Sequence, residues 1–432
     1  MSNLVLFNKL KTYLYNFMTL FFKKYSNHFL LAGIGMISLL LLVVLLDIHQ
    51  QTLIFPDATN YNESATNLYW YVRGHCNRPL LMAAIYGFPL VFGASEFDLY
   101  LTAQFINGVF WLMTILLMYE IFIQYVSTKV AFWLSILFIC FFGISLYNFH
   151  FLAETPFLFF LVASFYFLQK YRQTKVFKWL VFALSIIVLS MLIKPASKFF
   201  ALLMLLYFIR ELIRNYTKKI MIVLYSSIGL CLIQAIGIKY QFGDFTISYI
   251  DSVTFYNYLF SKADCYRKGT DFDQMNNPRA DYLFTFKVHD QKKIVKADII
   301  EQLQNNKINL VKAYLHNFVW NTASANVVPI TYSNINNSKR FEITKSFLIW
   351  LTKYQNRIMT ILGIVLSLIM IRKYYKKDIF LLFVAVFILY IIGISGISSN
   401  QGDRFHIMTY PFTLILIANY LKSKPFFAPP QK

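Results

Sequence analysis

Long apolar stretches dominate this chain and limit what it can fold into. Several of them, of which 29–47 is the first, approach the about 20 residues that a helix needs to cross a bilayer core. Hydrophobic residues make up 58% of the chain, above the roughly 45–50% that is usual for soluble domains. The sequence therefore predicts an all-α integral membrane protein that crosses the membrane many times.

Ten segments have the length and composition of transmembrane helices. They are residues 29–47, 99–123, 130–147, 151–168, 178–193, 196–210, 220–238, 346–371, 379–397 and 407–421. The apolar stretch 80–93 is shorter and contains Pro89. A stretch of this length is too short to span, so we expect a juxtamembrane half-helix there.

The net charge of +21 is distributed over loops between the apolar stretches. About half of the 41 Lys and Arg residues lie in 1–28, 124–129, 169–178, 210–219, 372–378 and 422–432. The positive-inside rule makes these segments, and both termini, cytoplasmic. A nucleic-acid-binding protein would gather its basic residues on one soluble face, so this charge pattern excludes that class.

This topology divides the chain into five parts. They are a cytoplasmic amphipathic N-terminus, 1–28, a transmembrane module, 29–238, with an outer loop, 48–98, a non-cytoplasmic domain, 239–345, C-terminal transmembrane helices, 346–421, and a cytoplasmic tail, 422–432. Apolar residues at helical spacing over 291–321 predict that the outer domain is α-rich, with a break at Asn305-Asn306. Turn-forming residues in 262–282 predict a flexible loop.

Four cysteines are too few for a disulfide scaffold. Cys140 and Cys231 fall inside predicted spans, where a packing role is typical. Cys76 and Cys265 both fall in the non-cytoplasmic parts, where oxidation can occur. A bridge between these two is a hypothesis for the structure to test.

Asp57 lies just past the first span and precedes Tyr61 by four residues. A carboxylate at the membrane surface is a candidate general base, with its pKa held close to its task by partial burial. The alternative is a solvated loop residue, or an N-cap of the helix that "ATNYNESATNLY" predicts. The spacing alone does not decide between them.

Glu154 stands at the mouth of the fourth span, directly before Thr155-Pro156, which predicts that the helix starts here. An ionisable residue at this depth indicates function, and the alternative is a favourable interaction with the helix dipole. His150, four residues earlier, would share its face if the helix extended back. A metal site is one interpretation of that pair, and an interfacial His is the other.

Several cations fall on outer turns, where the positive-inside rule does not place them. They are Arg78, Lys194, Lys198 and Arg404, with His406 beside the last of these. Such cations need an anion, and lipid phosphate is the natural one at this depth. Snorkelling to the headgroups would explain any single one of them. Their presence on three separate turns favours an anion pocket.

These pieces, in this order, resemble the GT-C superfamily of membrane glycosyltransferases, which includes protein O-mannosyltransferases and the aminoarabinose transferase of lipid A. The resemblance rests on "PDATNYNESA", "NRPLLMAAIYGFPLVFG", "LYLTAQFINGVFWLMTILLMYEIF", "LAETPFLFFLVASFYFL", "LIKPASKFFALLMLLYF" and "DRFHIMTYPFTLILIANYL". Together they touch most of 50–210 and the last 30 residues, whereas 239–345 matches only in placement.

The resemblance implies an inverting transfer of a sugar from a polyprenyl-phosphate donor to an acceptor hydroxyl at the outer face of a membrane. Asp57 would be the general base and Glu154 the second catalytic residue. The substrate-binding residues would be Tyr61, Arg78, Lys194, Lys198, Arg404 and His406. The acceptor would be a glycan, a lipid or a protein, and the membrane a bacterial cytoplasmic membrane.

Two departures from the family pattern bear on the site. Position 58 is Ala where some members carry a second acid, although Glu63 lies close enough to replace it. A divalent metal ion is therefore left unassigned, with His75 and His150 as candidate ligands. Arg78 stands where Lys or His is often found, which keeps the charge and changes its geometry.

Two other functions stay open from the sequence. One is a glycan polymerase or ligase that uses diphosphate-linked donors, whose chemistry does not need Asp57. The other is a lipid or sugar transporter, for which ionisable residues inside spans are typical. Lys353 and Arg357 fall within the eighth predicted span and leave room for that reading.

Overall fold

The computed structural model describes residues 25–48, 55–331, 338–375 and 377–422. All regular elements in these residues are helices, and they contain no strand. This confirms the all-α class. The amphipathic helix expected near the N-terminus lies in 1–24, outside the described residues.

The helices of the first half follow one another with short connections. They are Tyr25–Leu45, α2 (Pro56–Tyr71), α3 (Leu80–Gly87), η2 (Phe88–Phe92), α4 (Glu96–Phe122), α5 (Thr128–Ile139), α6 (Phe142–Leu146), η3 (Tyr147–Phe149), α7 (Glu154–Thr174), α8 (Phe177–Ser190), η4 (Pro195–Ser197), α9 (Lys198–Tyr207), α10 (Ile209–Arg214) and α11 (Met221–Phe242). Helix α7 begins at Glu154, as the sequence predicts.

The second half contains several short helices and four that are 17 residues long or longer. They are α12 (Ile250–Thr254), η5 (Phe255–Phe260), α13 (Ser261–Lys268), α14 (Pro278–Phe284), α15 (Val288–Asn305), α16 (Lys307–Ala323), α17 (Val327–Thr331), α18 (Lys339–Tyr374), α19 (Ile379–Ser395), η6 (His406–Thr409) and α20 (Tyr410–Lys422). The break between α15 and α16 falls at Asn306, as predicted.

Four helices of the described residues are long and apolar enough to cross a membrane. They are Tyr25–Leu45, Glu96–Phe122, Met221–Phe242 and Lys339–Tyr374. A fifth span is possible if Thr128–Ile139 and Phe142–Phe149, which meet at a bend of 53°, count as one. The predicted number of ten spans is therefore not confirmed, because several of the other apolar helices, among them α8, α9 and α19, are shorter.

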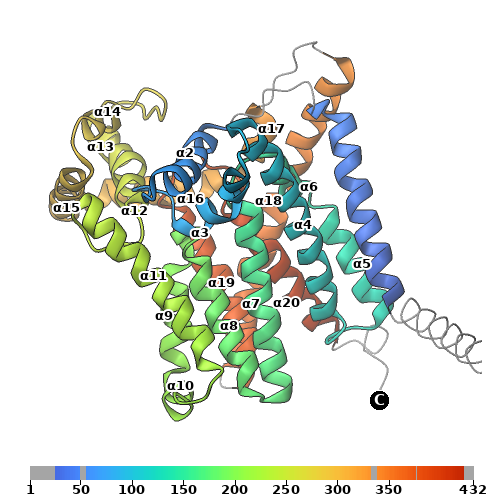
Figure 1. The fold of residues 1–432 in the computed structure, drawn as a ribbon. Coiled ribbons are helices and arrows are strands. Elements are labelled where there is room, and N and C mark those ends of the chain that lie inside the picture. Colours follow the sequence, from blue (N-terminus) through green and yellow to red (C-terminus); the bar gives the residue numbers. More distant parts are fainter. Residues whose placement is uncertain (1–24, 49–54, 332–337, 376, 423–432) are drawn as a thin grey trace, which may run out of the picture.

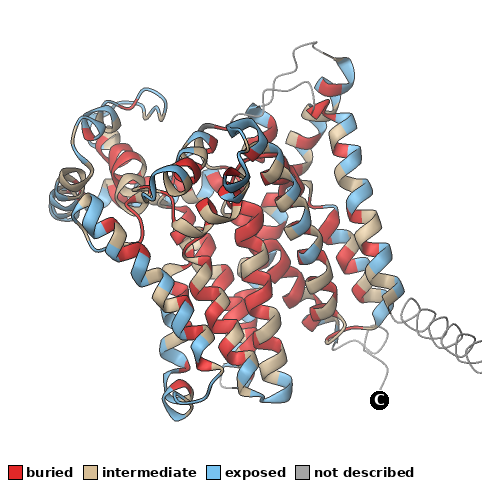
Figure 2. Cartoon of the chain, viewed as in Figure 1, coloured by how far each residue is buried: buried red, intermediate tan, exposed pale blue. Residues whose placement is uncertain are grey.

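The core lies where α7 packs against α4, α8 and α19 (Figures 1 and 2). Phe165 of α7 stands 4.7 Å from Phe412 and 5.6 Å from Phe387, measured between ring centroids. Ser164 donates a hydrogen bond of 2.8 Å to the carbonyl of Ala183 on α8. Close packing of this kind, rather than water exclusion, holds helices together inside a membrane.

The two outer parts predicted from the sequence lie at one end of the molecule. Figure 1 shows α2, α3 and α12–α17 gathered at one end and α10 at the opposite end. The short apolar segment predicted over 80–93 forms α3 and η2 beside α2, and is not a span. A Cβ on Gly87 would collide with the ring of Tyr69 on α2, so glycine permits this close approach.

Two predictions that involve residues 239–345 are wrong. Residues 262–282, expected to be a flexible loop, contain most of α13 and part of α14. Asp264 orders them, because its buried carboxylate pairs with Arg267, Lys268 and Arg279. The bridge between Cys76 and Cys265 is not formed, and both cysteines are free.

Two hydrogen bonds to backbone carbonyls join the loop 48–98 to residues 239–345 in place of that bridge. The amide of Tyr249 donates to the carbonyl of Cys76 at 2.9 Å. The hydroxyl of Ser248 donates to the carbonyl of Asn77 at 2.8 Å. The turn before Arg78 is therefore held directly against the segment that leads into α12.

Candidate active site

Helix α2 presents Asp57 and Tyr61 on one face, because residues four apart lie one above the other on a helix. Both contact Arg78. Its Nη2 lies 2.9 Å from Oδ1 of Asp57, and its guanidinium lies 4.5 Å from the ring centroid of Tyr61. The N-cap position of α2 is occupied by Phe55 and Asp57 lies within the first turn, so the expected alternative of a capping residue is not found.

A tight turn aims Arg78 at this face. Nδ1 of His75 accepts hydrogen bonds of 3.1 Å from the backbone amides of Asn77 and Arg78. Nε2 of the same ring faces the carboxylate of Glu63 at 3.6 Å. His75 therefore organises the turn, and its Nδ1 lone pair is already used as an acceptor.

Glu154 forms ion pairs with two cations from distant parts of the chain. Its Oε1 lies 2.9 Å from Nζ of Lys194 and 2.5 Å from Nε of Arg404. The residue is buried, with 1% of its surface exposed. Its second carboxylate oxygen is also buried and has no hydrogen-bond partner, so Glu154 keeps unused acceptor capacity.

Arg404 joins the two carboxylates into one network. While its Nε contacts Glu154, its Nη2 lies 2.6 Å from Oδ2 of Asp57. The five residues alternate in sign, in the order Arg78, Asp57, Arg404, Glu154, Lys194, and we call them the ion-pair ladder. Three cations and two carboxylates leave a formal net charge of +1.

The pKa of Asp57 is lowered, whereas partial burial alone would raise it. Burial raises the pKa of this carboxyl, but the charges of Arg404 and Arg78 and their hydrogen bonds outweigh burial and hold the pKa well below its usual range. In this state Asp57 is ionised and a weak base. Burial raises the pKa of Tyr61 to about 12, so its hydroxyl stays neutral beneath Arg78.

Lys198 pairs with Asp251 of α12, outside the ladder. Asp251 was not predicted from the sequence, because 239–345 resembles the GT-C superfamily only in its placement and contains no motif that would point to this residue. A lone Asp between apolar and hydroxyl side chains, as in "YIDSV", was the available signal. Lys198 thus finds its anion in the protein itself, whereas the ladder keeps an excess of positive charge.

His406 lies away from the ladder, although it follows Arg404 by two residues. Its buried ring contacts the side chains of Thr360, Asn356 and Ser395 at 2.8–3.1 Å. These contacts use both ring nitrogens. His406 lines neither of the two cavities that border the ladder, so its predicted contact with substrate has no support in the geometry.

The candidate metal ligands do not gather. No group of three or more His, Cys, Asp or Glu that could hold a metal ion occurs in the part of the chain that the structure describes. His150 lies in the buried loop before α7, with its ring 6.0 Å from that of Phe55. Glu63 remains on the exposed side of α2 and does not replace the missing second acid.

Lys353 and Arg357, which favoured a transporter, also have structural explanations. Lys353 is exposed on the surface of α18. The guanidinium of Arg357 donates to the carbonyl of Ala323 at the end of α16, at 3.2 and 3.3 Å. A cation at a helix C-terminus satisfies free carbonyls there.

Two cavities border the ladder. The small cavity, of about 290 Å³, is lined by Tyr61, Lys198, Phe199, Asp251 and Tyr390, among others. The large cavity, of about 550 Å³, is lined by Asp57, Tyr258, Gln274, Trp320 and Gln401, among others. Three ladder cations line both, namely Arg78, Lys194 and Arg404.

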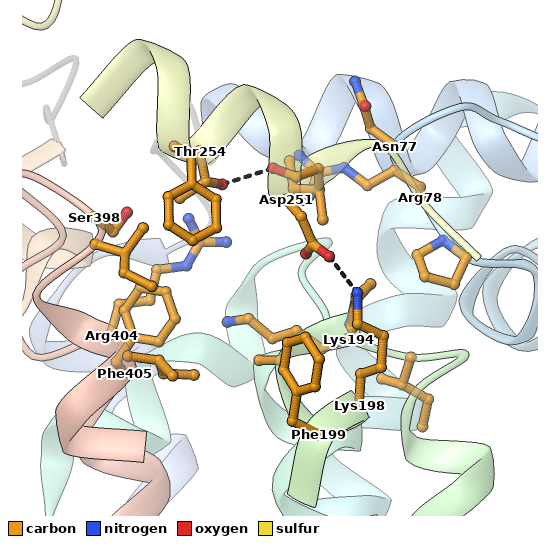
Figure 3. A pocket seen from close by; sticks show the side chains of 18 of the residues that line it. Asn77, Arg78, Lys194, Lys198, Phe199, Asp251, Thr254, Ser398, Arg404 and Phe405 are labelled. Carbon is orange, nitrogen blue, oxygen red and sulfur yellow. Dashed lines mark hydrogen bonds and ion pairs between the residues drawn. The ribbon is translucent and has the colours of Figure 1, made fainter. Parts of the chain in front are cut away.

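Figure 3 shows the small cavity from close by, with Lys198 bonded to Asp251 on one side and Arg404 on the other. The three ladder cations therefore form a wall that both cavities share, and Asp57 lines only the large one. A substrate in each cavity would contact these shared cations.

No protein-family model matches this sequence, and no curated protein sequence matches it. Among solved structures, the chain is similar to the archaeal oligosaccharyltransferase AglB from Archaeoglobus fulgidus in complex with an inhibitory peptide and a dolichol-phosphate. The two share 14% sequence identity with a TM-score of 0.48, over 93% of this chain and 50% of that chain. This chain thus spans about half of that structure's length. A likeness this distant carries no information about activity.

Proposed function

We propose that this protein is an inverting glycosyltransferase of the GT-C type, which transfers a sugar from a polyprenyl-phosphate donor to an acceptor hydroxyl. The observation that carries the proposal is the ladder itself. A carboxylate lies between two arginines whose side chains line both cavities, and the ladder carries one excess positive charge.

The charge of the ladder matches such a donor before and after reaction. A sugar–phosphate–polyprenyl diester carries one negative charge, which balances the ladder at +1. When the acceptor proton moves to Asp57, the ladder reaches +2, while the released polyprenyl phosphate carries two negative charges. The site thus stays neutral through the step, which lowers the cost of charge development in a water-poor site.

The reaction follows from this arrangement. The acceptor oxygen attacks the anomeric carbon, its proton passes to Asp57, and the bond between that carbon and the phosphate oxygen breaks. The electron pair remains on the phosphate, where Arg404, Lys194 and Arg78 stabilise it. A single base opposite a phosphate leaving group gives inversion of configuration, and Glu154 holds Lys194 and Arg404 in position.

Donor binding would also activate Asp57. Its low pKa comes from Arg404 and Arg78, and phosphate oxygens compete for the same guanidinium groups. Once the donor engages these arginines, their hold on the carboxylate weakens and its basicity rises. The base therefore becomes effective only when the leaving group is in place.

The small cavity suits the lipid-linked substrate. Its lining is mainly apolar and includes Phe199, which lies on α9 and is 62% exposed. Leu202, Leu203 and Leu206 extend this exposed apolar surface along the same helix. An apolar helix surface next to a phosphate-binding wall allows a lipid chain to remain in the membrane while its headgroup reaches the ladder.

In this proposal the ladder lies at the outer face of the membrane. The basic loops around 169–178 and 210–219 lie at the end of the helices away from α2 and α12 (Figure 1), and the positive-inside rule makes that end cytoplasmic. A bacterial cytoplasmic membrane, with 239–345 on its outer side, is the setting that we propose.

Native mass spectrometry of the full chain in nanodiscs with added undecaprenyl phosphate tests the donor site. We expect the wild-type protein to retain the lipid and Arg404→Gln to lose most of it. Arg172→Gln is the matched control, because Arg172 forms an ion pair of 2.6 Å with Asp378 in a basic loop and lines neither cavity. Equal retention by all three proteins would contradict the proposal.

A diphosphate-linked glycan lipid, added in the same way, distinguishes the proposed function from that of a glycan polymerase or ligase. Preferred retention of that lipid would support a polymerase or ligase, whose donor carries more charge than the ladder balances. Preference for the monophosphate is the expected result.

A further inference from the structure

The large cavity carries an inference about the acceptor, which rests on the proposed function. We propose that the acceptor is a saccharide, bound in the large cavity against the indole of Trp320 with one hydroxyl directed at Asp57. Sequence and function leave a glycan, a lipid or a protein open, and the side chains around this cavity distinguish them.

Trp320 has the features of a stacking platform. It lies on α16 with 49% of its surface exposed, although it lines a cavity. Its ring is nearly parallel to that of His316, at an interplanar angle of 8° and a centroid distance of 6.4 Å. A flat, pre-oriented ring binds the apolar C–H face of a pyranose at little entropic cost, and its N–H remains a donor.

Planar amides stand around the same space. Gln274, Asn400 and Gln401 all line the large cavity. Oε1 of Gln274 is buried and has no hydrogen-bond partner, and a buried acceptor in that condition costs about 1–3 kcal/mol. A ligand hydroxyl would satisfy it, since an amide offers both donors and an acceptor to the hydroxyls of a sugar.

The charges of the cavity argue against an anionic acceptor. Its only Lys and Arg among the described lining residues are Arg78, Lys194 and Arg404, which the ladder already uses for its carboxylates and the donor phosphate. A phosphorylated lipid acceptor would need cations of its own. A neutral ligand with many hydroxyls fits the lining better.

The position of Asp57 links this cavity to the reaction. Asp57 lines the large cavity and does not line the small one. A sugar stacked on Trp320 would therefore occupy the side of the ladder from which the general base is reached, and the donor phosphate would lie at the shared wall. The acceptor hydroxyl and the leaving phosphate would then lie on opposite sides of the anomeric carbon, as inversion requires.

Saturation-transfer NMR on the full chain in nanodiscs tests the inference. The probes are the methyl β-glycosides of glucose, galactose and N-acetylglucosamine, methyl α-mannoside, and a Ser/Thr-containing hexapeptide. We expect saturation of the C–H face of at least one glycoside, and a loss of about fivefold or more in Trp320→Ala. Trp320→Phe should keep most of the signal because it retains a flat ring.

Trp350→Ala is the matched control, because Trp350 is also exposed but lies on α18 and lines neither cavity. The inference is overturned if no glycoside is saturated, if Trp320→Ala and Trp350→Ala behave alike, or if the peptide alone depends on Trp320. Undecaprenyl phosphate retention is measured on the same samples. If glycoside binding depends on Trp320 but the lipid is not retained, the proposed donor is rejected. If the lipid is retained but no glycoside binding depends on Trp320, the saccharide acceptor is rejected.

Discussion

Two polar clusters meet at the turn 395–406, and they differ in what they leave unsatisfied. The ion-pair ladder reaches this turn through Arg404. On the other side of the turn is a neutral cluster, which we call the amide cluster; it consists of Asn317, Asn321, Asn356, Thr360, Ser395 and His406. The six residues of the amide cluster are buried, the ladder is partly buried, and only the ladder borders the two cavities.

The amide cluster is complete. Nδ2 of Asn321 donates to the carbonyls of Ser395 and Ser398 at 2.9 and 2.7 Å, and its Oδ1 accepts from the amide of Gln401 at 3.1 Å. Asn356 donates in turn to the carbonyl of Asn321 at 2.6 Å. Each of its six side chains has hydrogen-bond partners, which is typical of a scaffold that holds one conformation.

The ladder is incomplete. Oε2 of Glu154 and Nε of Arg78 are buried and have no hydrogen-bond partner, and the cluster carries an excess charge. Buried charges that are not fully satisfied are costly and are typical of sites that receive a ligand. The comparison teaches that the amide cluster fixes the conformation of the turn, and that this turn positions Arg404 in the ladder.

The largest expected effect is on Asp57. Asp57→Asn removes the proposed base and should lower kcat/KM for sugar transfer by about 10³-fold, measured with a radiolabelled donor. Lipid retention should persist or increase, because the ladder then carries +2. Glu63→Gln, a change on the exposed side of the same helix, should remain active. Full activity in Asp57→Asn would falsify the proposed mechanism.

Glu154→Gln should have the next largest effect. It preserves the shape of a buried side chain but removes the charge that aligns Lys194 and Arg404, and we expect kcat to fall on the order of 10²-fold. Glu120→Gln is a suitable control, because Glu120 pairs with His28 at 2.8 Å far from the ladder. If both variants lose activity equally, Glu154 has no special role in transfer.

Asn321→Leu tests the other side of the comparison. It removes the side-chain partner of the carbonyl of Ser398 and of the amide of Gln401, and each buried group left unsatisfied costs about 1–3 kcal/mol. We expect a lower Tm by scanning fluorimetry, with activity reduced only as far as Arg404 is displaced. The exposed Asn276, changed to Leu, should leave Tm unaltered. A variant with normal Tm and lost activity would move Asn321 into the catalytic group.

The last expected effect is a pH dependence of the stability of the protein, and not of its transfer activity. Burial raises the pKa of Asp403 to about 8, well above the about 3.9 of an unfolded chain. The stability gained from the protonated carboxyl is full below about pH 4 and is lost as pH rises toward 8. The Tm of the wild-type protein should therefore fall over this range relative to Asp403→Asn. Parallel Tm curves for the two proteins would contradict a neutral Asp403.

Two consecutive residues of the turn, Asp403 and Arg404, have different partners. A carboxyl oxygen of Asp403 accepts a hydrogen bond of 3.2 Å from Asn326, whereas Arg404 belongs to the ladder. The backbone of the turn decides this, because Asn400 and Gly402 have left-handed φ angles of 54° and 53°. A Cβ on Gly402 would collide with the carbonyl of Ala325, so a glycine is needed where the turn meets α17.

Much of the architecture could be predicted from the sequence. Apolar stretches at helical length predict helices in a membrane, since backbone groups in lipid must be satisfied within the helix. The start of α7 at Glu154 and the break at Asn306 follow from local signals. The number of spans could not be predicted, because apolar length does not distinguish a crossing helix from a short packed one.

Sequence by itself determined the residue types of this protein's site. Carboxylates and cations at the ends of apolar segments are costly there, so Asp57, Arg78, Glu154, Lys194 and Arg404 could be identified without a structure. Only the tertiary structure decided their pairing, the low pKa of Asp57 and the separation of Arg404 from His406. The physical reason is that these properties depend on distances between side chains far apart in the chain, such as Asp57 and Arg404, which are 347 positions apart, and local sequence does not encode such distances.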